Sequence, residues 1–292
     1  MRVTALSDVE PRPRSVAVGE FDGVHLGHRE VIAGNDTVLT FDPHPATVVK
    51  PDRAPKLLTS LDVKIDLIAE LGVEELVIVP FDDAFAHREA ADFIDSVLVD
   101  TLHATHVSVG ENFRFGHGTR GDAAMLVADQ RFVTRVVPMV QADGATVSST
   151  RIRTLIGEGD MEEAGRLLGA PFRIRGEVVP GDRRGRTLGF PTANIASDPD
   201  LASPAYGVYA CRVGERLAAV NFGVRPMFGE DLQPVLEAFI LDFQGDLYGQ
   251  QLTVEFFTHL RGEQRFESVE QLVEQIQRDV DRTRELLASG VE

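Results

Sequence analysis

The spacing of hydrophobic residues changes near residue 170, and this change constrains the fold more than any other feature of the sequence. Before residue 170, short apolar runs alternate with stretches of helical period, which is typical of βα units and predicts a parallel sheet covered on both faces. Beyond it, short strand-like runs are separated by Gly and Pro, which predicts a small antiparallel barrel or sandwich. A chain of 292 residues is long enough for two cores. We therefore predict domains at residues 1–170 and 171–292.

The individual elements follow from periodicity and from signals at their ends. Strands are predicted at residues 15–18, 37–41, 76–80, 106–109 and 132–138 of the first half, and at residues 173–179, 207–213, 217–222, 236–242 and 252–257 of the second. Helices are predicted at residues 61–71 and 90–102. A closing helix is expected to begin after Ser268, because Ser268 and Gln271 have the spacing of a capping box.

Composition excludes several classes of partner. The formal net charge of -17 argues against a general nucleic-acid binder, because phosphate backbones require clustered Lys and Arg. No apolar stretch approaches the roughly 18 residues of a membrane span, and the N-terminus is not signal-like. We therefore expect a cytoplasmic protein with no nucleic-acid, membrane or obligate protein partner. The single cysteine, Cys211, lies in a strand-like run and is expected to be structural.

Two histidines follow the first predicted strand. The loop from Gly19 onward leads from that strand into a helix, and such a turn presents free backbone N–H groups to a phosphate. His25 and His28 are three residues apart at the helix start, so both rings can face one ligand. Gly27 between them permits close approach of a nucleotide. A pair of surface histidines is the alternative interpretation of this spacing.

A Gly-rich segment in the second half has the composition of another phosphate site. Gly181, Gly185 and Gly189 allow the backbone to approach phosphates closely. Thr192 and Asn194 alternate onto one side of an extended segment, and their oxygens are hard ligands suited to Mg²⁺. On composition alone, a Gly-rich hairpin with polar caps is the better interpretation.

The order of these segments and their residue patterns resemble those of one protein family. Residues 21–28, FDGVHLGH, are similar to the HxGH signature of nucleotidylyltransferases, in the form found in prokaryotic bifunctional riboflavin kinase/FMN adenylyltransferases, or FAD synthetases. Residues 189–194, GFPTAN, are similar to the signature of riboflavin kinases. Further matching segments are residues 39–45, 109–116, 148–153, 206–209, 221–223 and 246–249.

The resemblance implies a fold and an activity for each half. Residues 1–170 would form an α/β Rossmann-like nucleotidylyltransferase domain, and residues 171–292 an antiparallel β-barrel of riboflavin kinase type with a closing helix. The enzyme would phosphorylate riboflavin with ATP to FMN, and then adenylylate FMN with ATP to FAD and pyrophosphate. Mg²⁺ is the implied cofactor, while riboflavin, FMN, FAD and ATP are substrates or products rather than prosthetic groups.

The same resemblance implies roles for individual residues. His25 and His28 would bind the ATP phosphates and stabilise charge on the α-phosphate. Glu237 would be the base for the ribityl 5′-hydroxyl, and Thr192 and Asn194 would hold Mg²⁺. The implied ATP- or phosphate-binding residues are Gly19, Phe21, Asp22, Gly27, Ser148, Ser149, Thr150, Arg153, Gly181 and Gly189, and the implied flavin-binding residues are Asn112, Phe113 and Arg114.

Ordinary structural roles stay open for several of these residues. The segment from Ser148 is also a suitable helix N-cap. Glu237 is also compatible with a solvent-facing position on an amphipathic strand, and Arg114 with an incidental place in a turn. His44, between two prolines, either lines the cleft or stabilises a rigid turn.

Two departures from the family pattern bear on activity. Val224 and Met227 stand where the family often has threonine, so two hydroxyls are missing from the kinase half. The segment from Arg29 to Asp36 is shorter than the helix that usually follows HxGH. Three alternatives therefore remain: a monofunctional riboflavin kinase with an impaired N-terminal half, a flavin-binding regulatory protein without turnover, and an adenylyltransferase with another phosphorylated substrate. The kinase-like half argues against the last.

Overall fold

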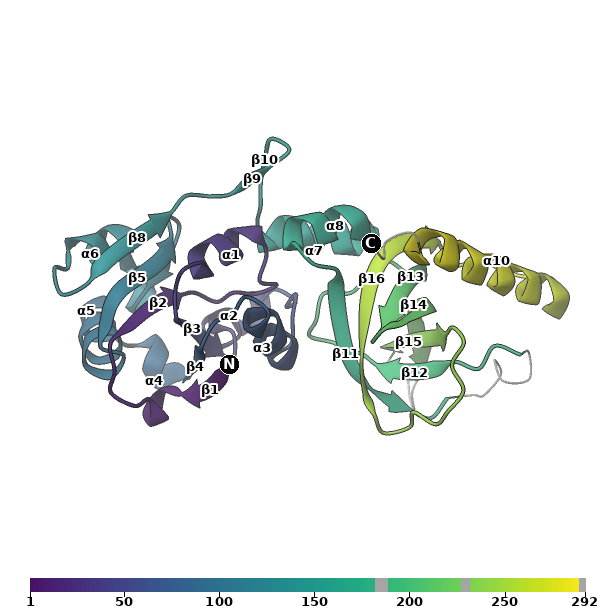
Figure 1. Cartoon of the computed structure of the whole chain (residues 1–292), viewed down its shortest axis with the longest axis horizontal. Helices are drawn as coiled ribbons and strands as arrows, with labels where there is room; N and C mark the ends of the chain where they lie inside the picture. Colours follow the sequence, from purple (N-terminus) through teal and green to yellow (C-terminus); the bar gives the residue numbers. More distant parts are fainter. Residues whose placement is uncertain (182–188, 227–231, 289–292) are drawn as a thin grey trace. The chain divides into compact units, whose positions relative to one another are not determined.

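The computed structural model describes residues 1–181, 189–226 and 232–288, which form two compact units (Figure 1). The first unit consists of Met1–Lys56 and Leu61–Ser149, and the second of Leu57–Ser60 and Thr150–Glu292. The chain passes from the first unit to the second after Ser149, which is earlier than the boundary that we predict after residue 170. The reason is that α8 (Met161–Leu168) packs on strands of the second unit. The domain boundary at residue 170 itself stays a prediction.

The first unit is built on a six-stranded parallel sheet with the order β1-β4-β3-β2-β5-β8, which confirms the Rossmann-like prediction. The strands are β1 (Arg2–Ala5), β2 (Arg14–Val18), β3 (Thr37–Asp42), β4 (Glu75–Pro80), β5 (Ala104–Gly110) and β8 (Val133–Val137). The helices are α1 (Leu26–Ile32), α2 (Pro45–Val49), α3 (Leu61–Ala69), α4 (Asp83–Ala86), α5 (Ala90–Asp92), the π-helix η3 (Phe93–Thr101) and α6 (Ala123–Ala128), with short 3-10 turns η1 (Leu6–Asp8), η2 (Pro51–Arg53) and η4 (His117–Thr119). Two small hairpins complete the unit, β6 (Arg114–Phe115) with β7 (Gly121–Asp122), and β9 (Gln141–Ala142) with β10 (Ala145–Thr146).

Both faces of the sheet are buried, as near-continuous apolar strands require. Val16 and Val18 of β2 pack in one core with side chains of η3 and α6. Ala17 between them is equally buried and points to the other face, because successive strand residues alternate. The helices α1 and α3 contribute buried residues such as Ile32 and Leu67.

The order of the strands reverses next to β2. The chain runs from β2 to β3 and β4 on one side, then returns to β5 on the other side of β2. Ala17 of β2 is paired with Ser108 of β5, so the carboxyl ends of these strands are neighbours. Ligands of open α/β sheets bind in the crevice that such a reversal creates.

Two features of this unit differ from the sequence prediction. The strand β1 is absent from our prediction, because it has four residues, no buried residue and only β4 as a partner. The helix predicted at residues 90–102 divides into α5 and the π-helix η3, where the Leu102 N–H bonds to the Val97 carbonyl at 2.9 Å. The spacing of hydrophobic residues along the sequence does not distinguish a π-helix from an α-helix.

The second unit is a closed antiparallel barrel with the order β11-β12-β15-β14-β13-β16, so the barrel is confirmed over the sandwich. Its strands are β11 (Phe172–Val179), β12 (Ala193–Ala196), β13 (Gly207–Val213), β14 (Arg216–Pro226), β15 (Leu232–Ile240) and β16 (Gln251–Arg261). The helix α7 (Ser149–Glu158) spans the division between the units and α8 follows it. We did not predict β12, because its four residues contain no repeated alternation. Cys211 is fully buried on β13, and burial raises the pKa of its thiol well above the usual value.

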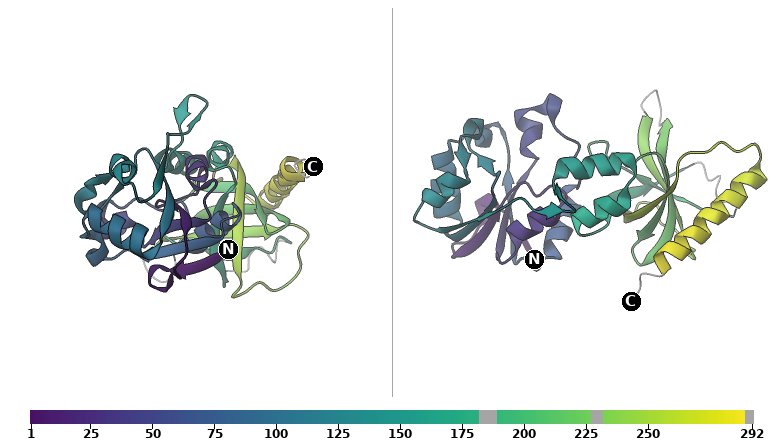
Figure 2. Two further views of the ribbon diagram at one scale, coloured as in Figure 1. Left: turned by 60° about the vertical axis from the view of Figure 1, so that its left-hand side comes forward. Right: turned by 90° about the horizontal axis from the view of Figure 1, so that it is seen from above.

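The closing helix α10 (Val269–Ala288) begins where the capping box predicts. Ser268 Oγ accepts a hydrogen bond from the Gln271 N–H, while Gln271 Oε1 accepts one from the Glu267 N–H. Figure 2 shows α10, in yellow, along the outside of the barrel. Among the residues that the structure describes, no helix is both long and apolar enough to cross a membrane.

A buried ion pair joins the amino ends of β2 and β4. Arg14 Nε donates to Glu75 Oε2 at 2.9 Å, and the two side chains are 0% and 1% exposed. Arg14 also donates to the carbonyl oxygens of Glu10 and Leu102, at 2.8 and 3.2 Å. Arg2 of β1 reaches the second carboxylate oxygen of Glu75 at 2.9 Å. One guanidinium therefore connects β2 to β4 and to the segment that precedes β5.

Replacing Glu75 with Gln should destabilise the first unit by about 3 kcal/mol at neutral pH, because the Arg14 guanidinium then stays buried without its anion. Burial alone would raise the pKa of this carboxyl, but hydrogen bonds and charges from Arg14, Thr4 and Arg2 lower it on balance. The stabilisation is thus complete above the unfolded pKa of about 4.3, and is lost as pH falls through the lower folded value.

Urea unfolding of wild type and Glu75→Gln at neutral pH and at about pH 3 measures this dependence, and the two curves should converge at low pH. The exposed neighbour Glu74 provides the control variant Glu74→Gln. Equal stability of Glu75→Gln and wild type at neutral pH would contradict the prediction.

Candidate active sites

A strained loop follows β2 at the carboxyl edge of the sheet. Phe21, Gly23 and Val24 have positive φ angles of 50°, 85° and 43°. A β-branched residue such as Val24 adopts this conformation only when its surroundings impose it. Phe21 and Val24 are buried, so packing supplies that constraint. Strain of this kind concentrates at ligand sites, which identifies the loop as a candidate site.

Side chains from three other segments hold this loop. The Glu20 carbonyl accepts hydrogen bonds from Lys64 Nζ at 2.9 Å and from Thr40 Oγ1 at 3.1 Å. Ser149 Oγ donates to the Asp22 carbonyl at 3.2 Å. The loop is therefore fixed before any ligand binds, which lowers the entropy cost of binding.

The two histidines of the signature stack on each other at the start of α1. His25 is the N-cap, and its Nδ1 accepts a hydrogen bond from the His28 N–H at 3.3 Å. The ring centroids are 3.5 Å apart, and Phe21 meets the His28 ring edge-on at 5.4 Å. A Cβ on Gly27 would lie 3.2 Å from the His25 ring, so glycine here leaves room for that ring. The structure therefore brings Phe21, His25 and His28 together, and the contact of both imidazoles with one ligand stays a prediction.

The surroundings of the His28 imidazole favour its neutral form. Burial, the neighbouring His25 ring and the charge of Lys64 together hold the pKa of His28 well below its usual value. Its Nδ1 is buried and has no hydrogen-bond partner within the described residues. A neutral imidazole with an unbonded Nδ1 can donate a hydrogen bond from Nε2 to an anionic oxygen.

The C-terminal end of α1 is capped by two side chains. Arg135 Nη2 of β8 lies within hydrogen-bond distance of the carbonyl oxygens of Glu30, Val31 and Ala33, at 2.7, 3.0 and 2.8 Å. Asn35 Nδ2 donates to the Val31 carbonyl at 3.0 Å. These contacts satisfy carbonyls that the helix leaves unpaired, and the guanidinium complements the negative end of the helix dipole.

This cap explains how the short segment after the histidines forms a helix. The helix α1 has seven residues and ends before Gly34, whose φ of 78° gives the left-handed stop. Isolated helices of this length are unstable in water, so the side-chain cap and tertiary packing carry the stability.

A buried polar cluster lies below the loop, and the sequence analysis missed most of it. Lys64 is 6% exposed on α3. His44 Nε2 lies 2.9 Å from the Glu20 carboxylate, while its Nδ1 caps α2 by accepting from the Ala46 N–H at 3.1 Å. His44 therefore stabilises the turn into α2, which is one of its two predicted alternatives, while its place in a ligand cleft stays a prediction. A signal for Lys64 existed, because it stands beside Val63 on the apolar stripe of a predicted helix.

The second phosphate motif of the sequence begins at the start of α7. Ser149 is the first residue of that helix and, as described above, holds the Asp22 carbonyl. Ser148 directly precedes the helix. Thr150 and Arg153 lie in its first two turns, in the second compact unit.

The residues with a predicted flavin contact follow β5. Asn112 is exposed beside Gly110, where a Cβ would lie 3.1 Å from Asn112 Oδ1. Phe113 is half-buried and stacks on Phe115 with centroids 5.5 Å apart. Arg114 forms an exposed ion pair with Asp122 at 3.1 Å. These residues thus lie beyond the carboxyl end of β5, on the same edge of the sheet as the histidine loop.

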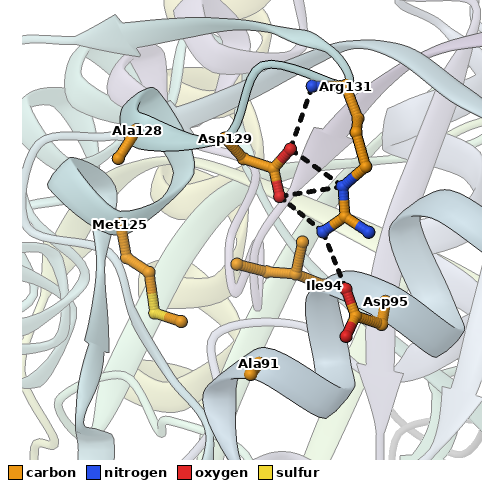
Figure 3. A pocket seen from close by; sticks show the side chains of 7 residues that line it. All are labelled: Ala91, Ile94, Asp95, Met125, Ala128, Asp129 and Arg131. Atoms are coloured by element: carbon orange, nitrogen blue, oxygen red, sulfur yellow. Dashed lines mark hydrogen bonds and ion pairs between the residues drawn. The ribbon is translucent and has the colours of Figure 1, made fainter.

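A pocket of ≈ 240 Å³ lies elsewhere on the first unit, between η3 and α6 (Figure 3). Its lining includes Ile94, Met125 and Arg131, and none of the predicted site residues. Arg131 is bound to Asp129 at 2.6 Å and to Asp95 at 2.7 Å. The charged groups of the pocket are therefore already paired with one another. The pocket offers no group for the phosphate chemistry that the sequence predicts.

On the barrel, three polar residues face one another across neighbouring strands. Asn194 of β12 pairs with Glu237 of β15, which pairs in turn with Asn221 of β14. Leu236 and Ala238 on either side of Glu237 are fully buried, so Glu237 points to the outer face of the barrel. The sequence analysis identified Asn194 and Glu237 as site residues. The position of Asn221 beside Glu237 follows only from the register of the sheet.

Asn194 is the best candidate for a cation ligand. It is buried, and its Oδ1 has no hydrogen-bond partner within the described residues. A Cβ on Gly181 would collide with the Asn194 amide, so glycine is required there for packing. Thr192 is exposed just before β12, and Gly189 is exposed with φ of 85°. A buried amide oxygen without a donor fits the requirement of Mg²⁺ for hard oxygen ligands.

Some residues of these motifs lie outside the described part of the chain. The residues not described include 182–188, with Gly185, just before the second signature, and Met227. For Val224 the structure describes the backbone within β14 alone.

Two family models match the chain in succession. Residues 7–151 match the family described as FAD synthetase, and residues 168–287 match the family described as riboflavin kinase. The first match contains the histidine loop, and the second contains the row from Asn194 to Asn221.

Individual proteins resemble the chain over nearly its whole length. A bifunctional riboflavin kinase/FMN adenylyltransferase of Listeria monocytogenes is 39% identical over 292 residues, covering 94% of this chain and 92% of the relative. A protein of the same name from Bacillus subtilis is 38% identical over 291 residues, covering 92% of each. A crystal structure from Streptococcus pneumoniae, named a macrolide-efflux protein, is 31% identical with a TM-score of 0.86, covering 97% of this chain and 99% of that one.

Replacing Arg135 with Gln should loosen α1, because the carbonyls at its end lose their charged donor. We expect about 1 kcal/mol less stability and faster hydrogen exchange at the amides of α1. Arg131→Gln is the control, since Arg131 binds carboxylates rather than a helix end. Exchange at α1 that is unchanged in Arg135→Gln, or equally raised in Arg131→Gln, would contradict the assignment of the cap.

Proposed function

The chain belongs to the family of bifunctional riboflavin kinase/FMN adenylyltransferases, and we propose on that premise how its two sites divide the synthesis of FAD. The barrel phosphorylates riboflavin with ATP to give FMN. The α/β unit transfers the adenylyl group of a second ATP to FMN, which gives FAD and pyrophosphate. The observation that carries this proposal is the presence of both family matches on one chain, each over a folded unit with its own polar site.

In the adenylyl transfer, we assign charge stabilisation to the stacked histidines. The FMN phosphate attacks the α-phosphorus of ATP, and pyrophosphate leaves. Neutral His28 donates a hydrogen bond from Nε2 to an α-phosphate oxygen, and His25 holds the start of α1 where backbone N–H groups point outward. No covalent intermediate is needed, because positioning and electrostatic stabilisation suffice for this transfer.

Other residues of the α/β unit bind the two substrates in this proposal. Gly19, Phe21, Asp22 and Gly27 shape the loop under the phosphates, and Ser148 and Ser149 receive the pyrophosphate. The pyrophosphate contacts that the family resemblance implies for Thr150 and Arg153, which lie on α7 in the second compact unit, stay predictions. Asn112, Phe113 and Arg114 contact the flavin. Arg114 would have to exchange its ion pair with Asp122 for that contact.

In the kinase reaction, Glu237 accepts the proton of the ribityl 5′-hydroxyl as the γ-phosphoryl group is transferred. Its position on the outer face of the barrel, between Asn194 and Asn221, supports this role. Thr192 and Asn194 would hold Mg²⁺, which supplies charge neutralisation at the ATP phosphates when bound. Gly181 and Gly189 border the same segment, and Gly181 gives the Asn194 amide its space.

The structure supports an active N-terminal half over an impaired one. The shortened segment after the histidines forms a capped helix, and the loop before it is fixed by Lys64, Thr40 and Ser149. A binding protein without turnover would need no base beside its cation ligand. Action in the cytoplasm, where ATP is supplied, and independence from protein partners complete the proposal.

Incubation of the purified chain with riboflavin, ATP and Mg²⁺, followed by chromatography of the flavins, tests this function. Wild type should form FMN and then FAD. His28→Ala should lower FAD formation at least about 10²-fold and leave FMN formation unchanged, because one donor to the developing charge is lost. His106→Ala, at an exposed position of β5, is the control. Loss of both activities in a folded His28→Ala protein would count against separate sites.

Glu237→Gln should reduce riboflavin phosphorylation by roughly 10² to 10⁴ through loss of the general base, while FMN supplied directly is still converted to FAD. Glu215→Gln, at an exposed turn of the same barrel, should leave both rates unchanged. Measurement of both half-reactions in each variant separates the effects. Normal phosphorylation by Glu237→Gln would make Glu237 an ordinary strand residue.

A further inference from the structure

Lys64 occupies an unusual position for a lysine. The sequence contains only three lysines, Lys50, Lys56 and Lys64, and the first two are exposed. Lys64 is 6% exposed on α3, below the loop that leads to the histidines. Burying an ammonium group is costly unless it is paired, so this charge requires an explanation in its surroundings.

The surroundings of Lys64 are acidic. Its Nζ donates to the Glu20 carbonyl at 2.9 Å, and its charge interacts favourably with the carboxylates of Asp22, Asp42 and Glu20. Asp22 is itself buried. These groups come from the loop after β2 and from the end of β3, the edge of the sheet where ligands bind.

His44 and the stacked histidines are the remaining titratable groups of this cluster. His44 Nε2 contacts the Glu20 carboxylate at 2.9 Å. Burial, the His25 ring and, to a smaller extent, the charge of Lys64 lower the pKa of His28. The cluster therefore combines three carboxylates with one ammonium group close to the proposed ATP phosphates.

We propose that Lys64 is an electrostatic positioning residue of the adenylyltransferase site, holding the loop through the Glu20 carbonyl and offsetting the three carboxylates so that the ATP polyphosphate can bind. This inference rests on the proposed adenylyl transfer. Without the ammonium, the carboxylates of Glu20, Asp22 and Asp42 would repel an ATP phosphate chain by like charge. The same charge adds to burial and to the His25 ring in lowering the pKa of His28, which favours the neutral imidazole that can donate through Nε2.

A compact ammonium suits this place better than a guanidinium does. Lysine presents a point charge with three donors on a thin stem, whereas arginine needs room for a planar fork. The chain otherwise uses arginine for nearly all its basic residues, so the lysine at position 64 follows from the site rather than from composition.

The test compares Lys64→Met, Lys64→Arg and the control Lys50→Met, with FMN and ATP as substrates. Circular dichroism checks the folding of each variant, and riboflavin phosphorylation is the control for the other site. Lys64→Met should raise the KM for ATP about tenfold or more, while riboflavin phosphorylation is unchanged. Lys64→Arg, which keeps the charge, should recover part of the ATP affinity. If Lys64 served packing alone, the order would reverse, because methionine matches the buried stem better than arginine.

The pH profile provides a second readout. In Lys64→Met the pKa of His28 should rise, so protonated His28 persists to higher pH and the acid limb of FAD formation moves upward. A folded Lys64→Met protein with wild-type KM for ATP and an unmoved acid limb would overturn the proposal. If wild type itself makes no FAD, the proposed function fails, and that result is distinct from a failure of this inference.

If the variants do not fold, a measurement on the wild-type protein tests the proposed role of Lys64. Nitrogen-15 spectra of the lysine side chains contain only three ammonium signals to assign. The Lys64 signal should titrate below the usual range of a lysine ammonium, because burial lowers its pKa. It should also shift when ATP is added without FMN, whereas the other two should not. An ATP-insensitive Lys64 signal would overturn the proposal.

Discussion

The position of the histidine site depends on the buried ion pair at the opposite edge of the sheet. Arg14 begins β2 and Glu75 begins β4, two strands that lie on either side of β3. The same guanidinium holds the Leu102 carbonyl, just before β5. Arg14 thus ties together both sides of the point at which the strand order reverses. Because strands are stiff, fixing their amino ends also sets where their carboxyl ends, and the loops that follow, are placed.

The histidine loop is held by this rigid sheet in a backbone conformation that its residues would not adopt alone. Phe21 and Val24 have positive φ angles that cost free energy, and burial of both side chains offsets this cost. Lys64 and Thr40 then hold the Glu20 carbonyl from below. The outcome is a loop, a capped helix start and two stacked imidazoles in one arrangement, with little freedom left to lose when a nucleotide binds.

The proposed kinase site of the barrel is assembled in a different way. Its polar row from Asn194 through Glu237 to Asn221 is created by strand register, with one residue from each of three neighbouring strands. No strained loop or helix dipole takes part in that row. Antiparallel pairing brings residues far apart in the chain to within side-chain reach, and alternation puts all three on the outer face.

Local periodicity and capping chemistry by themselves determined the α/β class of the first half, the antiparallel class of the second and the closing helix. The resemblance to a family added the barrel and the motif residues. His25, His28, Asn194 and Glu237 were all identifiable in this way. The sequence did not reveal β1 or β12, whose four residues are too short for a periodic signal, or the π-helix in place of an α-helix. Only the tertiary structure decided that Lys64 lies under the histidine loop, that Arg135 caps α1, and that Asn221 stands beside Glu237. Each of these contacts joins segments that are distant in the chain, and their energies come from burial and register rather than from neighbours in sequence.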